Sequence, residues 1–378
     1  MRDSRMDDLA RLLVKHSLRL KKDEGVLIEA FDTPDEMVGA LVRAVDRVGG
    51  VPLVSLKRAA VLRDLLATGP ASRVRDRIRA AARFEAARMR GVSAYVAIRG
   101  SHNVSELADI PAESLREYQK HWIEAVHLKI RVPKTRWVVL RWPNPSMAQL
   151  AGMSTPRFED FYFDVCLVDY AAMARAAKPL ARLMEKTDEV RISAPGTDLR
   201  FSIAGIPAVP CCRNANVPDG ECFTAPVRDS IEGTIRFNAK TLYLGSTHEN
   251  VTLRFEKGRV VDASSSDTKA LRAVLDTDPG ARYFGEFALG FHPVIREPMC
   301  DILFDEKIRG SLHMALGACY DETPNGNKSA VHWDLVQMQE RDKGGGKVWF
   351  DGKLIRENGR FLPKSLQGLN PDRLGRRR

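Results

Sequence analysis

The stretch GVLIEAFDTPDEMVGALVRAVDRVGGVPLVSL, residues 25–56, decides the fold of the first part of the chain. Its apolar run at 25–31 predicts a buried strand, and the run at 51–56 predicts the next strand. Residues 33–50 between them predict a helix that has Thr33 as its capping residue, Pro34 in its first turn and two glycines at its end. Strand–helix–strand order predicts a parallel sheet that is covered by helices.

The same alternation continues along the first half of the chain and then stops. Further strands are predicted at 92–100 and 136–143, with helices within 59–90 and near 168–186. After residue 188, short alternating segments between Gly, Pro and Asn turns predict antiparallel β structure, with a helix near 268–276. We therefore expect an α/β N-terminal domain with a parallel sheet (1–188) and an α+β, largely antiparallel C-terminal domain (189–378).

Composition excludes several classes of protein. The 378 residues are 44% hydrophobic and 29% charged, as in a soluble globular protein of two domains. No apolar run approaches a membrane span, and the charged N-terminus lacks the apolar core of a signal peptide, so we expect a cytoplasmic protein without a membrane partner. The net charge of +10 comes mainly from arginines interleaved with acids and alanines, as in residues 73–90. We interpret these as solvated helix faces and expect no nucleic-acid partner.

The cysteines and the glycine patterns exclude further chemistry. Six cysteines occur without a C-x-x-C pair, so we expect reduced thiols rather than a disulfide framework. No G-x-G-x-x-G follows the first strand and no Walker A motif is present, so no nucleotide is expected.

The segment SAVHWDLV, residues 329–336, places two polar side chains in an apolar strand. Because strand side chains alternate between faces, His332 and Asp334 point one way and Trp333 points the other. A solvated edge strand and a pair of metal ligands both explain this pattern.

Two glutamates occupy comparable positions. Glu221 follows the turn Pro218-Asp219-Gly220 and precedes an apolar run, which suits either a fixed ligand or a solvated turn acid. Glu286 lies in ARYFGEFALGF, where a buried carboxylate needs a cation, either an arginine or a metal ion.

The segment LFDEKIRGSLHMALGACY, residues 303–320, adds His313, which is either a core histidine or a ligand, together with Glu306 and Tyr320. Zinc, cobalt and manganese accept mixed imidazole and carboxylate ligands. Two glutamates, two histidines and an aspartate are more ligands than one zinc ion needs. Two ions that share a carboxylate would use all five.

These segments resemble the metalloaminopeptidase family of aminopeptidase T, aminopeptidase S and PepS. The family pattern N-x-P-x-G-E-x-F-x-x-P is matched over residues 216–226, and its G-E-x-A-L over 285–289. Its FDE…H-x-A-x-G-x-x-Y is matched over 304–320, and its H-x-D by His332 and Asp334. The similarity extends through RWPNPSMAQLAGMS (141–154) and covers most of the chain. Two departures are the longer segment DEKIRGSLH before His313 and the shorter loop that follows Tyr320.

The resemblance implies a homodimeric, metal-dependent aminopeptidase that removes N-terminal residues from small peptides, with its catalytic metal site in the second domain. It implies two divalent metal ions, Zn²⁺ or else Co²⁺ or Mn²⁺, held by Glu221, Glu286, His313, His332 and Asp334. We assign Glu286 as the carboxylate closest to proton transfer and Glu306 as the second candidate. Tyr320 is either a donor to the oxyanion of the reaction or a structural hydroxyl.

A second hypothesis keeps the fold and changes the chemistry. A non-haem Fe(II) ring-cleaving dioxygenase that acts on a dihydroxypyridine is similar in fold to this family. Iron oxygenases favour two histidines and one carboxylate, whereas the presence of both Glu221 and Glu286 suits two hydrolytic ions better.

Overall fold

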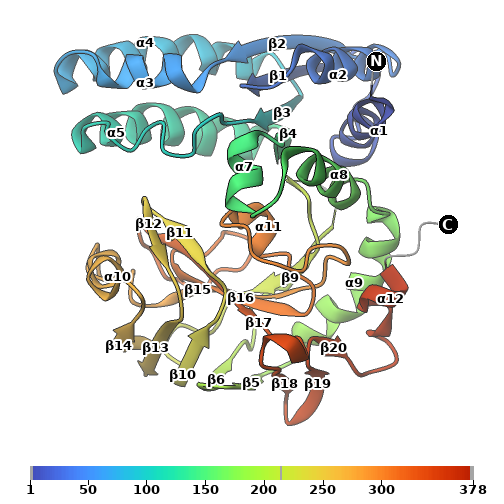
Figure 1. Cartoon of the computed structure of the whole chain (residues 1–378), viewed down its shortest axis with the longest axis vertical. Coiled ribbons are helices and arrows are strands. Elements are labelled where there is room, and N and C mark those ends of the chain that lie inside the picture. Colours follow the sequence, from blue (N-terminus) through green and yellow to red (C-terminus); the bar gives the residue numbers. More distant parts are fainter. Residues whose placement is uncertain (1–2, 213–214, 375–378) are drawn as a thin grey trace. The chain divides into compact units, whose positions relative to one another are not determined.

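The computed structural model describes residues 3–212 and 215–374 (Figure 1). The chain divides into two compact units. The first comprises the described residues up to Leu167 together with 215–217, and the second comprises 168–212 and the described residues from Pro218 onward. Helix α9 (Tyr170–Met184), which the sequence-based boundary at 188/189 assigns to the first domain, belongs to the second unit.

The first unit is built on a parallel sheet, as the sequence predicts, but its fifth strand comes from residues 216–217, which the sequence analysis assigns to the second domain. In spatial order its strands are β2 (Val51–Lys57), β1 (Gly25–Phe31), β3 (Ala94–Arg99), β4 (Arg136–Arg141) and β8 (Asn216–Val217). The central strands β1 and β3 are buried along most of their length, which explains their continuous apolar sequence. Strand β2 forms an edge and leaves Val51, Leu53 and Leu56 exposed.

Helices precede, connect and follow these strands along the chain. They are α1 (Ser4–Leu12), η1 (Leu13–Ser17), α2 (Asp35–Asp46), α3 (Ala59–Ala67), α4 (Ala71–Arg90), α5 (Ala112–Tyr118), η2 (Gln119–Arg131), α6 (Val132–Lys134), α7 (Pro145–Leu150) and α8 (Thr155–Cys166). The predicted cap of α2 is wrong, because Pro34 takes the cap position and the Thr33 hydroxyl donates to the carbonyl of Phe31 at 2.8 Å. Thr33 therefore stabilises the turn that leaves β1 and does not cap the helix.

The second unit contains two antiparallel sheets and a short hairpin, which confirms the predicted change of architecture. The larger sheet is ordered β14 (Arg259–Ser264), β13 (Val251–Glu256), β10 (Glu232–Phe237), β6 (Thr197–Ser202), β5 (Glu189–Ala194), β18 (Lys347–Phe350), β19 (Lys353–Glu357) and β20 (Arg360–Phe361). The smaller sheet is ordered β17 (His332–Met338), β16 (Ser311–Gly317), β15 (Phe284–Gly290), β9 (Glu221–Thr224) and β7 (Val209–Cys211). The hairpin pairs β11 (Thr241–Tyr243) with β12 (Ser246–His248).

Short helices complete this unit. They are α10 (Thr268–Leu275), α11 (Ile302–Asp305), η3 (Arg341–Lys343), η4 (Gln367–Leu369) and α12 (Pro371–Leu374). Among the helices of the described ranges, none combines the length and the apolar character that a membrane span requires.

The smaller sheet forms the buried centre of the second unit. Strands β15 and β16 are buried at every position. Phe287 packs against Phe201 of the larger sheet with ring centroids 5.0 Å apart, and Phe284 packs against Phe237 at 6.2 Å. Helix α9 contacts strands β7 and β9 (Figure 1). Polar side chains on this sheet therefore need partners within the protein.

Candidate metal centre

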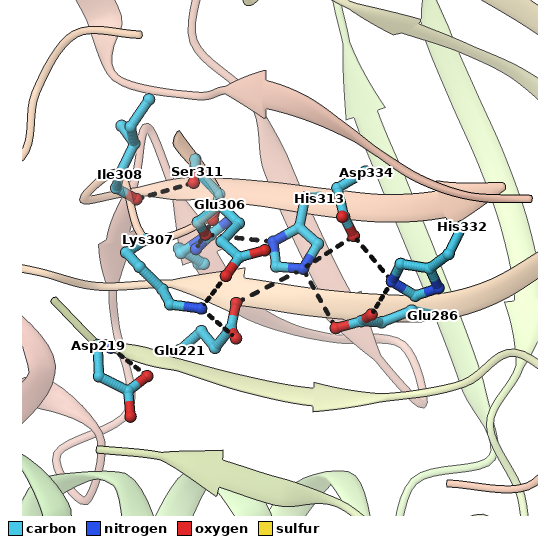
Figure 2. A network of polar contacts seen from close by, with 12 residues as sticks. Asp219, Glu221, Glu286, Glu306, Lys307, Ile308, Ser311, His313, His332 and Asp334 are labelled. Carbon is cyan, nitrogen blue, oxygen red and sulfur yellow. Dashed lines mark hydrogen bonds and ion pairs between the residues drawn. The ribbon is translucent and has the colours of Figure 1, made fainter. Parts of the chain in front are cut away.

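Five side chains singled out by the sequence lie on one face of the smaller sheet. Glu221 is on β9, Glu286 on β15 and His313 on β16, while His332 and Asp334 are both on β17. The register pairs Glu286 with Ala315 and Ala315 with Asp334, which sets the two carboxylates in one row across three strands. Directly paired residues point to the same face, so the five side chains converge (Figure 2).

Small residues beside each ligand position make room for this convergence. Each of the five is paired on at least one side with alanine or glycine: Glu221 with Gly290, Glu286 and Asp334 with Ala315, His313 with Ala288, and His332 with Gly317. Larger side chains at these positions would fill the space between the imidazoles and the carboxylates. The segments FALG and HMALG therefore shape the site as well as packing the core.

A bulge and a turn orient the two glutamates. The β15–β16 register shifts between Phe284 and Glu286, and a Cβ on Gly285 would lie 2.3 Å from the carbonyl oxygen of Ala318. Only glycine fits at this position of the bulge. The bulge in turn directs the side chain of Glu286 into the site. Gly220 has φ +148° and packs against the backbone of His292, immediately before Glu221.

The ligand atoms form two groups that share Glu286. In the group called here the Glu221 triad, His313 Nε2 lies 3.5 Å from Glu221 Oε2 and 3.3 Å from Glu286 Oε1. In the Asp334 triad, His332 Nε2 lies 3.4 Å from Glu286 Oε2 and 3.6 Å from Asp334 Oδ1. Each oxygen of Glu286 thus faces a different histidine, and Figure 2 shows this carboxylate between the two imidazoles.

Backbone carbonyls fix the tautomer of both histidines. His313 Nδ1 lies 3.2 Å from the carbonyl oxygen of Glu306, and His332 Nδ1 lies 2.9 Å from that of Ala318. A carbonyl oxygen only accepts hydrogen bonds, so each Nδ1 carries a proton. The other ring nitrogen, Nε2, points at carboxylate oxygens. Metal-ligating histidines use this arrangement, in which the second nitrogen donates to a carbonyl.

Three buried atoms at this centre lack a hydrogen-bond partner among residues 3–212 and 215–374: Glu221 Oε2, His332 Nε2 and Asp334 Oδ1. Glu221 Oε2 belongs to the Glu221 triad, and the other two atoms belong to the Asp334 triad. With His332 Nε2 unprotonated, each atom offers a lone pair, so a cation in each triad would satisfy them. The residues present therefore fit a divalent metal ion.

The electrostatics of the site also favour a bound cation. Burial opposes ionisation of Glu286, but His313 and His332 outweigh it and lower its pKa to about 2. Burial opposes protonation of the histidines, but the surrounding carboxylates raise the pKa of each to about 10. Protons therefore hold the positions that a metal ion would take, and the two compete.

Glu306 and Lys307 adjoin the Glu221 triad, just after α11. Lys307 Nζ donates to Glu221 Oε1 at 2.6 Å and also to Glu306 Oε1. Burial and the charges of Glu221 and Asp334 raise the pKa of Glu306 to about 8, although Lys307 opposes this shift. Arg309, two residues further on, pairs with Glu340 at 2.9 Å.

Tyr320 lies at the rim of the site. Its ring packs against that of His332, with centroids 4.8 Å apart, and against Phe223 at 5.6 Å. The residue as a whole is 45% exposed, but burial of its hydroxyl, together with the charges of Glu286 and Asp334, raises the pKa of that hydroxyl.

All seven residues selected from the sequence lie in this one region. The arginine that the sequence analysis considered as the cation beside Glu286 is not found there among the described residues. The charged contacts of Glu286 are His313 and His332, and no arginine pairs with it in the described ranges. Sequence reasoning missed that Lys307 binds Glu221. The available signal was a lysine next to Glu306 within the otherwise apolar segment LFDEKI.

The family model for thermophilic metalloproteases (M29) matches residues 2–361. The chain belongs to this family. The M29 match confirms the resemblance that the motifs indicate, and it covers both units of the structure.

Curated relatives are aminopeptidases. The chain is 33% identical over 183 residues to aminopeptidase T of Thermus thermophilus, covering 41% of this chain and 44% of that protein. It is 28% identical over 275 residues to aminopeptidase T of Thermus aquaticus, covering 62% and 65%. Aminopeptidase 2 of Geobacillus stearothermophilus is 40% identical over 28% of this chain and 27% of its own length. These alignments span less than two thirds of each relative.

Solved structures confirm the fold along nearly the whole chain. Wild-type AmpT from Thermus thermophilus matches with a TM-score of 0.80 and 25% identity, over 95% of this chain and 99% of that one. The 2,5-dihydroxypyridine dioxygenase of Pseudomonas putida matches with a TM-score of 0.60 and 16% identity, over 96% and 98%. The second likeness concerns the fold alone.

Proposed function

We propose that this M29 protein is a metal-dependent aminopeptidase that removes N-terminal residues from small peptides at a two-ion site. The observation that carries the proposal is the shared carboxylate: Glu286 Oε1 lies 3.3 Å from His313 Nε2, and Oε2 lies 3.4 Å from His332 Nε2. A carboxylate whose two oxygens face two separate ligand groups is the bridge that a two-metal hydrolase uses. The aminopeptidase relatives support the reaction class.

The ligands divide between the ions as the triads do. One ion would be held by Glu221, Glu286 and His313, and the other by Glu286, His332 and Asp334. Mixed nitrogen and oxygen ligands suit Zn²⁺, with Co²⁺ and Mn²⁺ as alternatives. The bound ions would act as Lewis acids on the peptide carbonyl and lower the pKa of a coordinated water.

The remaining side chains handle the proton and the oxyanion. Both oxygens of Glu286 face histidines, so Glu306 is the better candidate for proton transfer. This reverses the order in which the sequence analysis ranked the two carboxylates. Its pKa of about 8 lies close to neutrality, where a proton carrier works best. The hydroxyl of Tyr320, which lies near the carboxylates of the site, would donate to the oxyanion that forms from the peptide carbonyl.

The proposal extends to the organisation of the protein. We assign catalysis to the predicted domain 189–378, because the five proposed ligands, Glu306 and Tyr320 all lie in the second unit. A cytoplasmic homodimer is proposed from the family resemblance. The exposed apolar side chains of edge strand β2 support a surface that a partner covers.

One observation favours a second candidate. His313 Nε2 lies 4.0 Å from Asp334 Oδ1, and His332 Nε2 lies 3.6 Å from the same atom, so two histidines and one carboxylate also meet at a point. This set is the one that non-haem Fe(II) oxygenases use. It leaves Glu221 and Glu286 without a function, which is why the hydrolase is preferred.

An assay of reconstituted protein separates the two candidates. Metal-free protein is loaded with zinc, cobalt, manganese or iron and tested against aminoacyl p-nitroanilides, short peptides and 2,5-dihydroxypyridine. We expect peptide-bond hydrolysis with at least one of the first three metals. Oxygen-dependent turnover of the pyridine with one iron per chain, without hydrolysis under any condition, would overturn the proposal.

A further inference from the structure

Lys307 is a fully buried ammonium that borders only one of the two triads. Its side chain has 0% exposure, and its backbone is held by Lys307 N donating to Phe304 and by His292 N donating to the Lys307 carbonyl. Nζ donates to Glu221 Oε1 at 2.6 Å and to Glu306 (Figure 2). Short contacts from a fully buried Nζ to two carboxylates are those of a charged ammonium.

The two outer carboxylates of the triads therefore have different surroundings. Glu221 gives Oε1 to Lys307 and has only Oε2 turned towards His313. Asp334 has no lysine or arginine partner within the described ranges, and its Oδ1 lacks a hydrogen bond. The Asp334 triad thus presents a carboxylate whose charge is not offset by a fixed cation.

Lys307 also offsets the negative charge of a neighbouring cluster of side chains. Cys211, Asp219 and Glu221 lie close enough together to hold an ion by geometry alone. The ammonium bound to Glu221 already offsets the charge of that group. Lys307 thus acts as an internal cation on this side of the site.

We infer that Lys307 is a positioning residue that makes the two ion-binding triads unequal, so that the Asp334 triad binds the first divalent ion tightly and the Glu221 triad binds the second more weakly. The inference rests on the proposed two-ion site. A fixed positive charge in contact with Glu221 repels an incoming dication and removes one carboxylate oxygen from coordination. At such short range in a buried site, a gap of about tenfold or more between the two affinities is expected.

The test is a metal titration of the metal-free full chain. Zn²⁺ is added in competition with a chromophoric chelator, and Co²⁺ is followed by its visible absorption, which reports coordination geometry. The unaltered protein should bind two ions in separate steps. Asp334→Asn should abolish the tight step, whereas Glu221→Gln should abolish only the weak one.

Two variants assign the difference to Lys307. Lys307→Met keeps the length of the side chain, frees Glu221 Oε1 and should tighten the second step by about tenfold or more, with a changed Co²⁺ spectrum in that step alone. The double variant Glu306→Gln/Lys307→Met removes one negative and one positive charge together. It should also tighten the second step. Because the net charge of the site is then unchanged, this result would assign the effect to the contact between Lys307 and Glu221. The double variant also leaves one fewer unpaired buried carboxylate, which makes it the substitute if Lys307→Met alone fails to fold.

Each outcome bears on one claim. Binding of a single ion would overturn the two-ion proposal itself. Two ions of equal affinity in the unaltered protein would overturn the role of Lys307 and leave the two-ion site standing. So would an unchanged gap between the two steps in Lys307→Met or in the double variant.

Discussion

Replacing Glu286 by glutamine tests the charge balance of the site directly. Lowering the pKa of this carboxyl from 4.5 to about 2 favours the folded state by about 3 kcal/mol at neutral pH, because the ionised form is stabilised by two histidines. This contribution is present above pH 4.5 and is lost as the pH falls towards 2. Glutamine keeps the size of the side chain and removes the charge, so metal-free Glu286→Gln should be less stable by about 3 kcal/mol.

The measurement is urea unfolding of chelator-treated protein at pH 7, followed by tryptophan fluorescence. Glu340→Gln is a matched control, because Glu340 pairs with Arg309 at 2.9 Å in the same unit and both side chains are 21% exposed. A partly exposed pair of this kind contributes less than about 1 kcal/mol. If Glu286→Gln loses no more stability than Glu340→Gln, the proposed role of Glu286 between two charged imidazoles is wrong.

Three further predictions concern protonation, the oxyanion and the bulge. Metal-free protein should lose stability as the pH rises from 6.5 to about 10, because His313 and His332 give up protons that stabilise the fold; a flat thermal-unfolding profile over this window would contradict this. Tyr320→Phe should lower kcat by about 100-fold without changing the metal content, and unaltered kcat would assign the hydroxyl a structural role. Gly285→Ala would force a Cβ to 2.3 Å from the carbonyl oxygen of Ala318, so calorimetry should find a lower Tm, with weaker metal binding; wild-type values for both would refute the bulge argument.

The fold was predictable where the hydrophobic pattern had one clear period. The short alternating segments predicted after residue 188 begin with β5 (Glu189–Ala194), and the apolar run at 25–31 coincides with β1. The cap of α2 was not predictable, because a threonine before a proline can either cap the helix or bond back to the strand. Here the carbonyl of Phe31 accepts from Thr33, and the helix begins later.

The site was predictable as a set of residue types but not as a geometry. His332 and Asp334 share a face by strand alternation, and the motifs indicated the other three members of the set. The sharing of Glu286 follows from the antiparallel register, which pairs Ala315 with both Glu286 and Asp334 and which sequence alone does not specify. Lys307 was hidden for the same reason, since its contact with Glu221 joins segments 86 residues apart.

Anomalous diffraction from crystals of zinc-loaded protein tests the central claim most directly. Two zinc peaks about 3.5–4 Å apart, one on each side of the Glu286 carboxylate, are predicted from the shared position of that side chain. A single peak bound by His313, His332 and Asp334, with Glu221 and Glu286 uncoordinated at saturating zinc, would contradict the two-ion site.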